Sequence, residues 1–324
     1  MKKITVLDLF SGIGGFHLGL EKAGYKVKSY FSEIDKHPIA VYKNNFKNST
    51  YVGSVTDVRK EQLPKINLIT FGSPCQDFSL AGNRKGMGGE RSSLILEAIR
   101  LIDECRPRVF IWENVKGTFS SNDGEDFWAI IKAFTDIGGY RLEWQLCNTK
   151  WFLPQNRERI YLVGHLGGGS GSKIFPIGES NKQIDELQGQ FTNTLTARYD
   201  GEGNGSYIIE GEQYAQKGIK KVGVYGSGNP TKGGTGPLSR DDGNTYCLDT
   251  GNSQAIEIKS SMRRLTPLEC ERLQGFPDHW TMKGVDGDKI VDISDSQRYK
   301  QCGNAVSVPV VQAVGLKIKE LIND

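Results

Sequence analysis

The chain reads Gly72-Ser73-Pro74-Cys75-Gln76-Asp77-Phe78-Ser79 directly after the apolar run Ile66–Phe71. The run has the length of a buried strand, and Gly72 and Pro74 are residues that end strands. Open α/β sheets bind ligands at the carboxyl ends of their strands, so Cys75 is predicted at a ligand site. A free thiol has a pKa near ~8.5, and even its small thiolate fraction at neutral pH is a strong nucleophile. An arbitrary cysteine is more often buried and structural, so the rest of the chain decides.

Candidate strands alternate with candidate helices from the amino terminus to about residue 166. The predicted strands are Ile4–Leu9, Val27–Phe31, Ile66–Phe71, Val109–Trp112, Leu142–Leu146 and Ile160–Val163. The predicted helices open near Gly14, after Asp35 and after Ser92, and cover Asp126–Phe134. Such alternation is typical of an α/β fold with a parallel sheet and helices on both faces.

The composition changes from Gly167 to about Lys259. This window holds 19 of the 40 glycines and shows no helical periodicity, so we interpret it as an insertion rich in strands and loops. Helical patterns then return. Thr266 followed by Pro267 predicts a capped helix start, and apolar residues at helical spacing after Pro309 predict a last helix that packs back onto the first domain.

Charge, cysteine content and hydropathy exclude several classes of protein. With 324 residues the chain can form two domains, and its net charge of +3 requires any polyanion to be bound by local basic clusters. The six cysteines form no Cys-x-x-Cys pair or Cys/His ligand spacing, which argues against a zinc site or a disulfide framework and favours a reducing compartment. Asp8 and Gly12 interrupt the first apolar run too early for a signal peptide, and no segment is long enough to span a membrane.

A glycine-rich turn follows the first predicted strand. The stretch Asp8–Phe16 opens a helix, which is the context in which such a turn approaches a nucleotide-like ligand. Glu33 ends the second strand, where a carboxylate can accept hydrogen bonds from ribose hydroxyls. The dinucleotide fingerprint Gly-x-Gly-x-x-Gly fails, because His17 stands in place of its third glycine. A nicotinamide or flavin enzyme is therefore disfavoured.

A carboxylate and two arginines follow later predicted strands. The run Ile111–Val115 places Glu113 at the end of a strand, on the same edge as Cys75 if the sheet is parallel. Arg157 and Arg159 alternate along another predicted strand, and paired arginines offer fixed donors to a ring carbonyl or a phosphate. Taken alone, Glu113 suits a helix cap and the arginines suit an ordinary edge strand. Together with a nucleophilic cysteine they favour attack on a heterocycle.

The assembled motifs resemble the DNA cytosine-5 methyltransferases of bacterial or phage restriction-modification type. In order along the chain they are Asp8–Phe16, Glu33, Gly72–Ser79, Glu113–Val115, Gln155–Gly164, Arg264–Pro277 and Gln301–Val306. The resemblance implies a Rossmann-like catalytic domain, formed by residues 1–166 and 300–324, that binds S-adenosylmethionine. It also implies a smaller, strand- and loop-rich target-recognition domain with its hinge over residues 167–299, and duplex DNA between the two domains.

The resemblance also implies a mechanism. The Cys75 thiolate adds to carbon 6 of cytosine, and carbon 5 then takes up the methyl group. Glu113 hydrogen-bonds ring nitrogen 3 and the exocyclic amine, Arg159 binds the ring oxygen, and Arg157 supports the site or a phosphate. The base must be flipped out of the duplex for this chemistry. Ser79, Arg84 and Lys85 are expected at the DNA, within or beside the glycine-rich loop Leu80–Arg91, which is suited to close as a lid, although an ordinary surface loop would look similar.

For the cofactor, the resemblance assigns residues from several of the motifs. They are Asp8, Phe10, Gly12, Ile13, Gly15, Glu33, Ile34, Ser54, Val55, Pro74, Leu94, Asn304 and Val306. This chain reads Gly53-Ser54-Val55 where the family commonly has an aspartate after the glycine. Ser54 is then the expected acceptor for the adenine amine.

Three other functions fit parts of the sequence. A tRNA cytosine-5 methyltransferase would share the fold, but its recognition region carries Cys-Phe-Thr, which none of the six cysteines here begins. A non-catalytic DNA-binding relative would not need Cys75, Glu113 and Arg159 together. A nucleotide-dependent oxidoreductase would need the missing glycine.

The resemblance implies double-stranded DNA as the partner, no metal and no membrane. It leaves room for a cognate restriction endonuclease that acts separately. We expect a monomer in the cytoplasm of a bacterium or of a phage-infected host cell.

Overall fold

The structure is a computed structural model that describes residues 1–73, 94–167, 173–178, 219–221, 239–240, 244–250, 254–258 and 261–322. Pro74, Cys75, Ser79, Arg84 and Lys85 lie outside the described residues, as does the whole predicted lid loop Leu80–Arg91. The predictions made for them therefore stay predictions.

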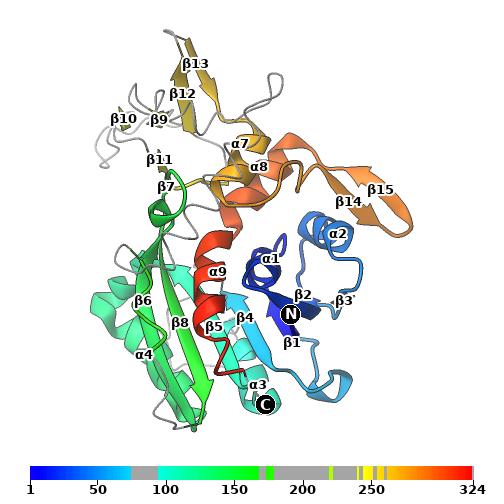
Figure 1. The fold of residues 1–324 in the computed structure, drawn as a ribbon, viewed down its shortest axis with the longest axis vertical. Coiled ribbons are helices and arrows are strands. Elements are labelled where there is room, and N and C mark those ends of the chain that lie inside the picture. Colours follow the sequence, from blue (N-terminus) through cyan, green and yellow to red (C-terminus); the bar gives the residue numbers. More distant parts are fainter. Residues whose placement is uncertain are drawn as a thin grey trace, which may run out of the picture.

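The first domain is built on a sheet in which seven described strands have the order β3-β2-β1-β4-β5-β8-β6. The strands are β1 (Lys2–Leu9), β2 (Tyr25–Ser32), β3 (Thr50–Tyr51), β4 (Leu68–Gly72), β5 (Val109–Val115), β6 (Tyr140–Asn148) and β8 (Glu158–Leu166). The helices of this domain are α1 (Gly15–Lys22), α2 (Lys36–Asn45), α3 (Leu94–Cys105), α4 (Glu125–Asp136) and, from the carboxyl-terminal end, α9 (Val308–Lys317). All six predicted strands and the predicted helices are confirmed, with shifted ends (Figure 1).

The sheet is not wholly parallel, which corrects the sequence prediction. Strands β1 to β5 pair in parallel, whereas β8 runs antiparallel to both β5 and β6. Parallel neighbours need a crossover connection of about a dozen residues or more, usually a helix. Only residues 149–157 join β6 to β8, so the chain returns directly as an antiparallel strand.

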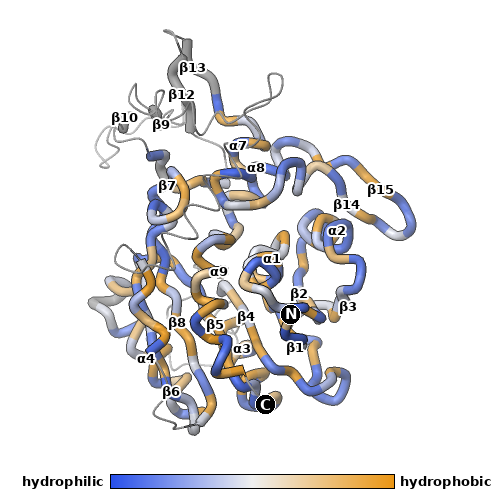
Figure 2. The backbone as a smooth tube through the Cα atoms, in the orientation of Figure 1, coloured by the Kyte–Doolittle hydropathy of each residue, from blue (hydrophilic) through white to orange (hydrophobic). Residues whose placement is uncertain are grey.

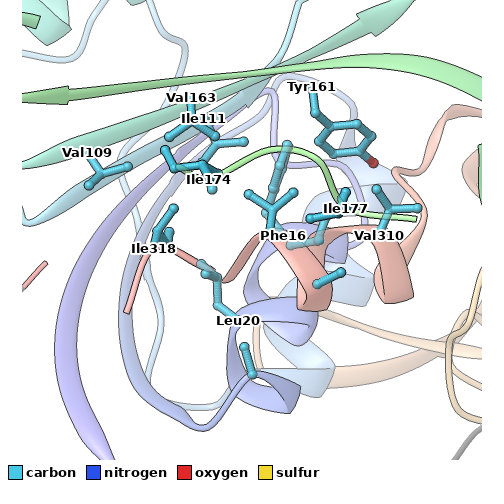
Figure 3. Close-up of a cluster of buried hydrophobic side chains, with 14 of the residues drawn as sticks. Phe16, Leu20, Val109, Ile111, Tyr161, Val163, Ile174, Ile177, Val310 and Ile318 are labelled. Carbon is cyan, nitrogen blue, oxygen red and sulfur yellow. The ribbon is translucent and has the colours of Figure 1, made fainter. Parts of the chain in front are cut away.

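Two apolar layers cover the two faces of the sheet. Alternate residues of β5 point to opposite sides: Val109 and Ile111 belong to one buried cluster, and Phe110 and Trp112 to the other. Figure 3 shows the first cluster, in which α1, α9 and the segment 174–177 meet β5 and β8. Helices α3 and α4 supply the second cluster. In Figure 2 the hydrophobic residues concentrate in the central strands and in α9.

Helix α9 packs directly against α1, as predicted for the carboxyl-terminal helix. A Cβ atom on Gly19 would lie only 2.5 Å from the Val311 side chain, so a glycine is needed for this close approach. The Tyr25 hydroxyl donates a hydrogen bond to the Gly315 carbonyl oxygen at 2.9 Å. The end of the chain is thereby fixed to the first strands of the sheet.

The other described strands and helices do not belong to the seven-stranded sheet or to the five helices named with it. A small sheet has the order β10-β9-β12-β13 among the described strands, and β11 pairs in parallel with β7. The bounds are β7 (Gln155–Asn156), β9 (Ile219–Lys221), β10 (Ser239–Arg240), β11 (Thr245–Tyr246), β12 (Gln254–Ile258), β13 (Ser261–Arg264), α7 (Pro267–Leu273), β14 (Lys283–Asp286), β15 (Lys289–Asp292) and α8 (Asp295–Asn304). The capped helix start is confirmed: Thr266 and Glu269 form a reciprocal capping box.

The hairpin β14–β15 packs on α2 of the first domain. A Cβ atom on Gly284 would lie 2.6 Å from the Ala40 Cβ atom, and Trp280 and Ile293 join the cluster around Phe31 and Tyr42. This hairpin was not predicted from the sequence. None of the helices in the described part of the chain is both long and apolar enough to cross a membrane.

Candidate active site

Strands β1, β2, β4 and β5 run in parallel and end beside one cavity of about 530 Å³. Most of the predicted site residues line it, although they come from seven separate stretches of sequence. They are Phe10, Gly12, Ile13, Gly15, Glu33, Ile34, Ser54, Val55, Leu94, Glu113, Arg157, Arg159, Asn304 and Val306. The volume is in the range of small-molecule and cofactor sites.

The glycine turn after β1 allows the chain to fold tightly under this cavity. Gly14 has φ 84° and precedes α1, and a Cβ atom there would lie 2.3 Å from the Phe46 ring. Only glycine fits this backbone conformation and this space. A Cβ atom on Gly15 would lie 2.6 Å from the Val306 side chain, so the turn also packs closely on the loop after α8.

The Glu33 carboxylate is held at the cavity by three backbone N–H groups. Its Oε2 atom accepts a hydrogen bond from the Gly12 amide at 3.0 Å. Its Oε1 atom accepts from the amides of Ile34 and Asp35 at 2.8 and 3.0 Å. A carboxylate offers about four acceptor positions, so capacity remains for a ligand hydroxyl. Glu33 is thus oriented before any ligand arrives.

Asp8 was predicted to bind the cofactor, but it does not line the cavity. The other described residues predicted at the cofactor do line it. Its carboxylate is fully buried and accepts hydrogen bonds from the hydroxyls of Thr70 at 2.7 Å and Tyr42 at 3.3 Å. Burial raises the pKa of Asp8 to about 7, although the two hydrogen bonds act in the opposite direction. Asp8 therefore joins β1 to β4 and α2 and does not line the cavity.

Ser54 lines the cavity from the turn after β3 and carries a defined hydrogen-bond partner. Its hydroxyl lies 2.9 Å from the Thr56 hydroxyl, which in turn donates to the Asp57 carboxylate at 3.3 Å. The Asp57 oxygens can only accept when ionised, so Thr56 accepts the hydrogen of Ser54. The lone pairs of Ser54 then remain available as acceptors.

Glu113 stands at the end of β5, paired in register with Gly72 of β4. Its side chain is 11% exposed, and its Oε1 atom lies 3.4 Å from Arg159 Nε but makes no hydrogen bond to the described residues. Burial raises the pKa of Glu113, while the positive charges of Arg159 and Arg157 oppose the rise. A carboxyl group in this setting is suited to carry a proton and to donate it in a hydrogen bond.

The two arginines have different environments. Arg157, which lies between β7 and β8 and not within a strand, is buried and donates to the carbonyl oxygens of Gly303 at 3.2 Å and Ala305 at 2.9 Å. It therefore fixes the loop after α8 and is not placed to bind a phosphate. Arg159 lies on β8 and faces Glu113, with its side chain 17% exposed. Both guanidinium groups approach the Cys247 sulfur, at 3.1 and 3.5 Å.

Several residues at the cavity were not predicted from the sequence. The Ser73 hydroxyl accepts hydrogen bonds from Trp112 Nε1 at 3.0 Å and from Asn114 Nδ2 at 3.2 Å, which fixes the chain where it leaves β4. Lys300 and Asp35 form an ion pair at 2.7 Å, and both line the cavity. Asn114 and Lys300 lie in or beside quoted motifs, so their positions gave a signal, but their partners are distant in sequence. Among the described residues no group of three or more His, Cys, Asp or Glu side chains is placed to hold a metal ion.

The structural resemblance is to solved methyltransferases. The fold matches a putative DNA modification methyltransferase from an Escherichia coli prophage, with a TM-score of 0.62 and 23% identity over 99% of this chain and all of that one. It also matches the Dnmt2 methyltransferase of S. pombe, with a TM-score of 0.67 and 19% identity over 98% of this chain and 99% of that one. At these identities the matches describe the fold alone.

Sequence comparison gives the family. The chain is 34% identical over 331 residues to the Type II methyltransferase M1.ScrFI of Lactococcus lactis subsp. cremoris, covering 99% of this chain and 79% of that protein. It is 33% identical over 344 residues to the Type II methyltransferase M.HpaII of Haemophilus parainfluenzae, covering 100% and 91%. The family model described as C-5 cytosine-specific DNA methylase matches residues 4–320. The chain belongs to the C-5 cytosine-specific DNA methylase family.

Proposed function

We propose that this DNA (cytosine-5)-methyltransferase transfers a methyl group from S-adenosylmethionine to carbon 5 of a cytosine flipped out of a specific duplex sequence. The proposal gives Cys75 the role of covalent nucleophile. The observation that carries it is the convergence of Glu33, Glu113 and Arg159 on one cavity at the carboxyl ends of parallel strands. A ribose-binding carboxylate and a base-binding pair thus share a single site.

The cavity fits S-adenosylmethionine. Glu33 is oriented to accept hydrogen bonds from the ribose hydroxyls, and the available lone pairs of Ser54 suit the adenine amine. The Ser11 hydroxyl is buried beside the glycine turn and has no hydrogen-bond partner among the described residues, which leaves a polar group for the amino-acid part of the cofactor. Phe10, Ile13, Leu94 and Val306 supply apolar lining. When bound, the cofactor supplies an electrophilic methyl group on its sulfonium.

The residues of the chain activate the cytosine ring. The Cys75 thiolate forms a bond to carbon 6, and the electron pair of the 5,6 double bond makes carbon 5 nucleophilic. Glu113 donates its proton in a hydrogen bond to ring nitrogen 3 and accepts one from the exocyclic amine, which offsets the negative charge that develops on the ring. Arg159 donates to the ring oxygen, and Arg157 holds the loop 303–305 in place. After methylation a solvent water takes the carbon 5 proton, the electrons of that C–H bond re-form the 5,6 double bond, and the bond from carbon 6 to sulfur breaks to release the Cys75 thiolate.

The flipped base requires additional contacts with DNA. Extruding a base costs a few kcal/mol in lost stacking and pairing. We assign the closing contacts to Ser79, Arg84 and Lys85, on and beside the loop Leu80–Arg91, whose cationic groups would reach phosphates. Binding should then weaken as salt increases.

The function is tested by expressing the gene in a host that lacks cytosine methylation. Mapping of 5-methylcytosine across the host genome should show modification at one short sequence motif. A genome without 5-methylcytosine, from cells that contain folded protein, would contradict the proposed activity.

Target recognition is assigned to residues 167–299, with the catalytic domain formed by residues 1–166 and 300–324. Exchanging residues 167–258 for the corresponding segment of a relative with another target should change which sites are methylated, because base contacts are made by few side chains on such segments. The same genome-wide map measures the result. An unchanged motif in an active exchange variant would place recognition elsewhere in the chain.

The relatives also bear on the partner and the cellular location that we propose for this enzyme. Because curated relatives are Type II methyltransferases, we infer that a cognate restriction endonuclease can accompany this enzyme and acts separately. We further propose that the enzyme acts without a metal, as a monomer, on DNA in the cytoplasm of a bacterium or of a phage-infected host cell.

A further inference from the structure

An ion pair connects two sides of the cofactor cavity. Lys300 Nζ lies 2.7 Å from Asp35 Oδ2, and the two residues are separated by 265 positions in sequence. Both side chains line the cavity and both stay partly exposed, Lys300 to 47% and Asp35 to 28%. A pair that lines a cavity and also reaches solvent lies at its rim.

Each partner is fixed by its own element. The other oxygen of Asp35 accepts a hydrogen bond from the His37 amide and caps the start of α2, two residues after Glu33. Burial disfavours the charge of Asp35, but the hydrogen bonds from Lys300 and from the His37 amide outweigh it and lower the pKa of this carboxyl group. Asp35 is therefore charged and oriented near neutral pH.

Lys300 lies in α8, which ends at the cavity residue Asn304. The same helix is anchored away from the cavity by Arg298, whose Nη2 atom lies 3.1 Å from Oε1 of the fully buried Glu271 in α7. The Lys300–Asp35 pair thus ties the cavity end of α8 to the Glu33 side of the same cavity.

We propose that the Lys300–Asp35 ion pair is a latch that slows release of the cofactor. The proposal rests on the proposed binding of S-adenosylmethionine in this cavity. Release requires the rim between α8 and α2 to widen, and widening separates the two charges. Lys300 and Asp35 are positioning residues in this account: they act on the opening of the cavity and not on the methyl transfer itself.

The latch is tested by the dissociation rate of S-adenosylhomocysteine from the full-length protein. Trp280 donates a hydrogen bond to the cavity residue Ile13, so stopped-flow tryptophan fluorescence is a suitable signal. Partly exposed ion pairs have small energies, and we expect Lys300→Met and Asp35→Asn each to raise the rate about two- to fivefold. Asparagine keeps the helix cap of α2, and Lys300→Arg, which keeps the charge, should stay near the wild-type rate.

Two further measurements distinguish a latch from a general loss of structure: the release rate of the double variant, and the effect of salt on release. The double variant should release the ligand no faster than either single variant, because both substitutions remove the same pair. Added salt should accelerate release from the wild type and not from the variants. At one fixed salt concentration, the variants should keep the DNA dissociation constant of the wild type. Lys132→Met is the matched control, because Lys132 and Asp136 form an exposed pair of the same 2.7 Å distance on α4.

The outcomes are distinct. If the wild type does not bind S-adenosylhomocysteine, the proposed cofactor site itself is wrong. If the wild type binds it and the Lys300 and Asp35 variants release it at the rate of the Lys132 control, the cofactor site stands and the latch is overturned. Additive effects in the double variant would also overturn it.

Discussion

Replacing Cys75 by alanine is expected to abolish methyl transfer to DNA while the protein still folds and binds S-adenosylhomocysteine. Without the thiolate no bond forms to carbon 6, and carbon 5 of an unactivated cytosine is a poor nucleophile. The measurement is the incorporation of labelled methyl groups into duplex DNA. Activity should fall to the background of the assay.

A matched cysteine controls for the loss of a thiol in general. Cys105 lies on α3, outside the cavity lining, and burial raises its pKa to about 11, so it is not ionised near neutral pH. Cys105→Ala should keep its activity. Methyl incorporation by the Cys75→Ala protein at the rate of the Cys105→Ala protein would contradict the assignment of the nucleophile.

Glu113→Gln is expected to lower the rate of methyl transfer about 10²- to 10⁴-fold, the usual contribution of a positioned acid or base. Glutamine keeps the shape of the side chain and can hydrogen-bond the ring, but it cannot share a proton with nitrogen 3 as charge develops. The cavity should still bind S-adenosylhomocysteine. Single-turnover kinetics with saturating DNA measure the chemical step.

The pH dependence provides an independent check on Glu113. Burial raises the pKa of this carboxyl group in the folded protein, so its protonated form persists above the usual range of a glutamate and is lost as pH rises through the raised pKa. The rate should therefore fall on the alkaline side of this pKa in the wild type and in the exposed control variant Glu61→Gln. A Glu113→Gln enzyme with the wild-type rate and the same alkaline decline would exclude the assigned role.

Most of the fold was predictable because its signals are local. The strand run Val109–Trp112 alternates side chains between two apolar layers, and Thr266 begins its helix with a capping box that is visible in the sequence. The antiparallel direction of β8 was not predictable from periodicity, because a strand pattern does not give its direction. The hairpin β14–β15 was missed because each strand has only four residues and only one of its two faces packs, on α2, so the apolar residues show no clear alternation.

The site was predicted as a set of residues but not as a set of contacts. Motif positions correctly gathered Glu33, Glu113 and Arg159 at one cavity. They gave no indication that Arg157 is bound to the carbonyl oxygens of Gly303 and Ala305, since those partners lie about 150 positions away. Asp8 was assigned to the ligand from its place in the glycine motif, whereas its alternation along β1 directs it to Thr70 and Tyr42 beneath the turn.

The covalent step is tested most directly with duplex DNA that carries 5-fluorocytosine at the target site found by the genome map. Fluorine cannot leave carbon 5 as the proton does, so the sulfur should stay attached to carbon 6 once the methyl group has been transferred. With S-adenosylmethionine present, peptide mass spectrometry should find the modified nucleotide on the peptide that contains Cys75. Methylation of normal DNA by a protein that forms no adduct with the fluorinated duplex, or forms one only at another residue, would contradict the account.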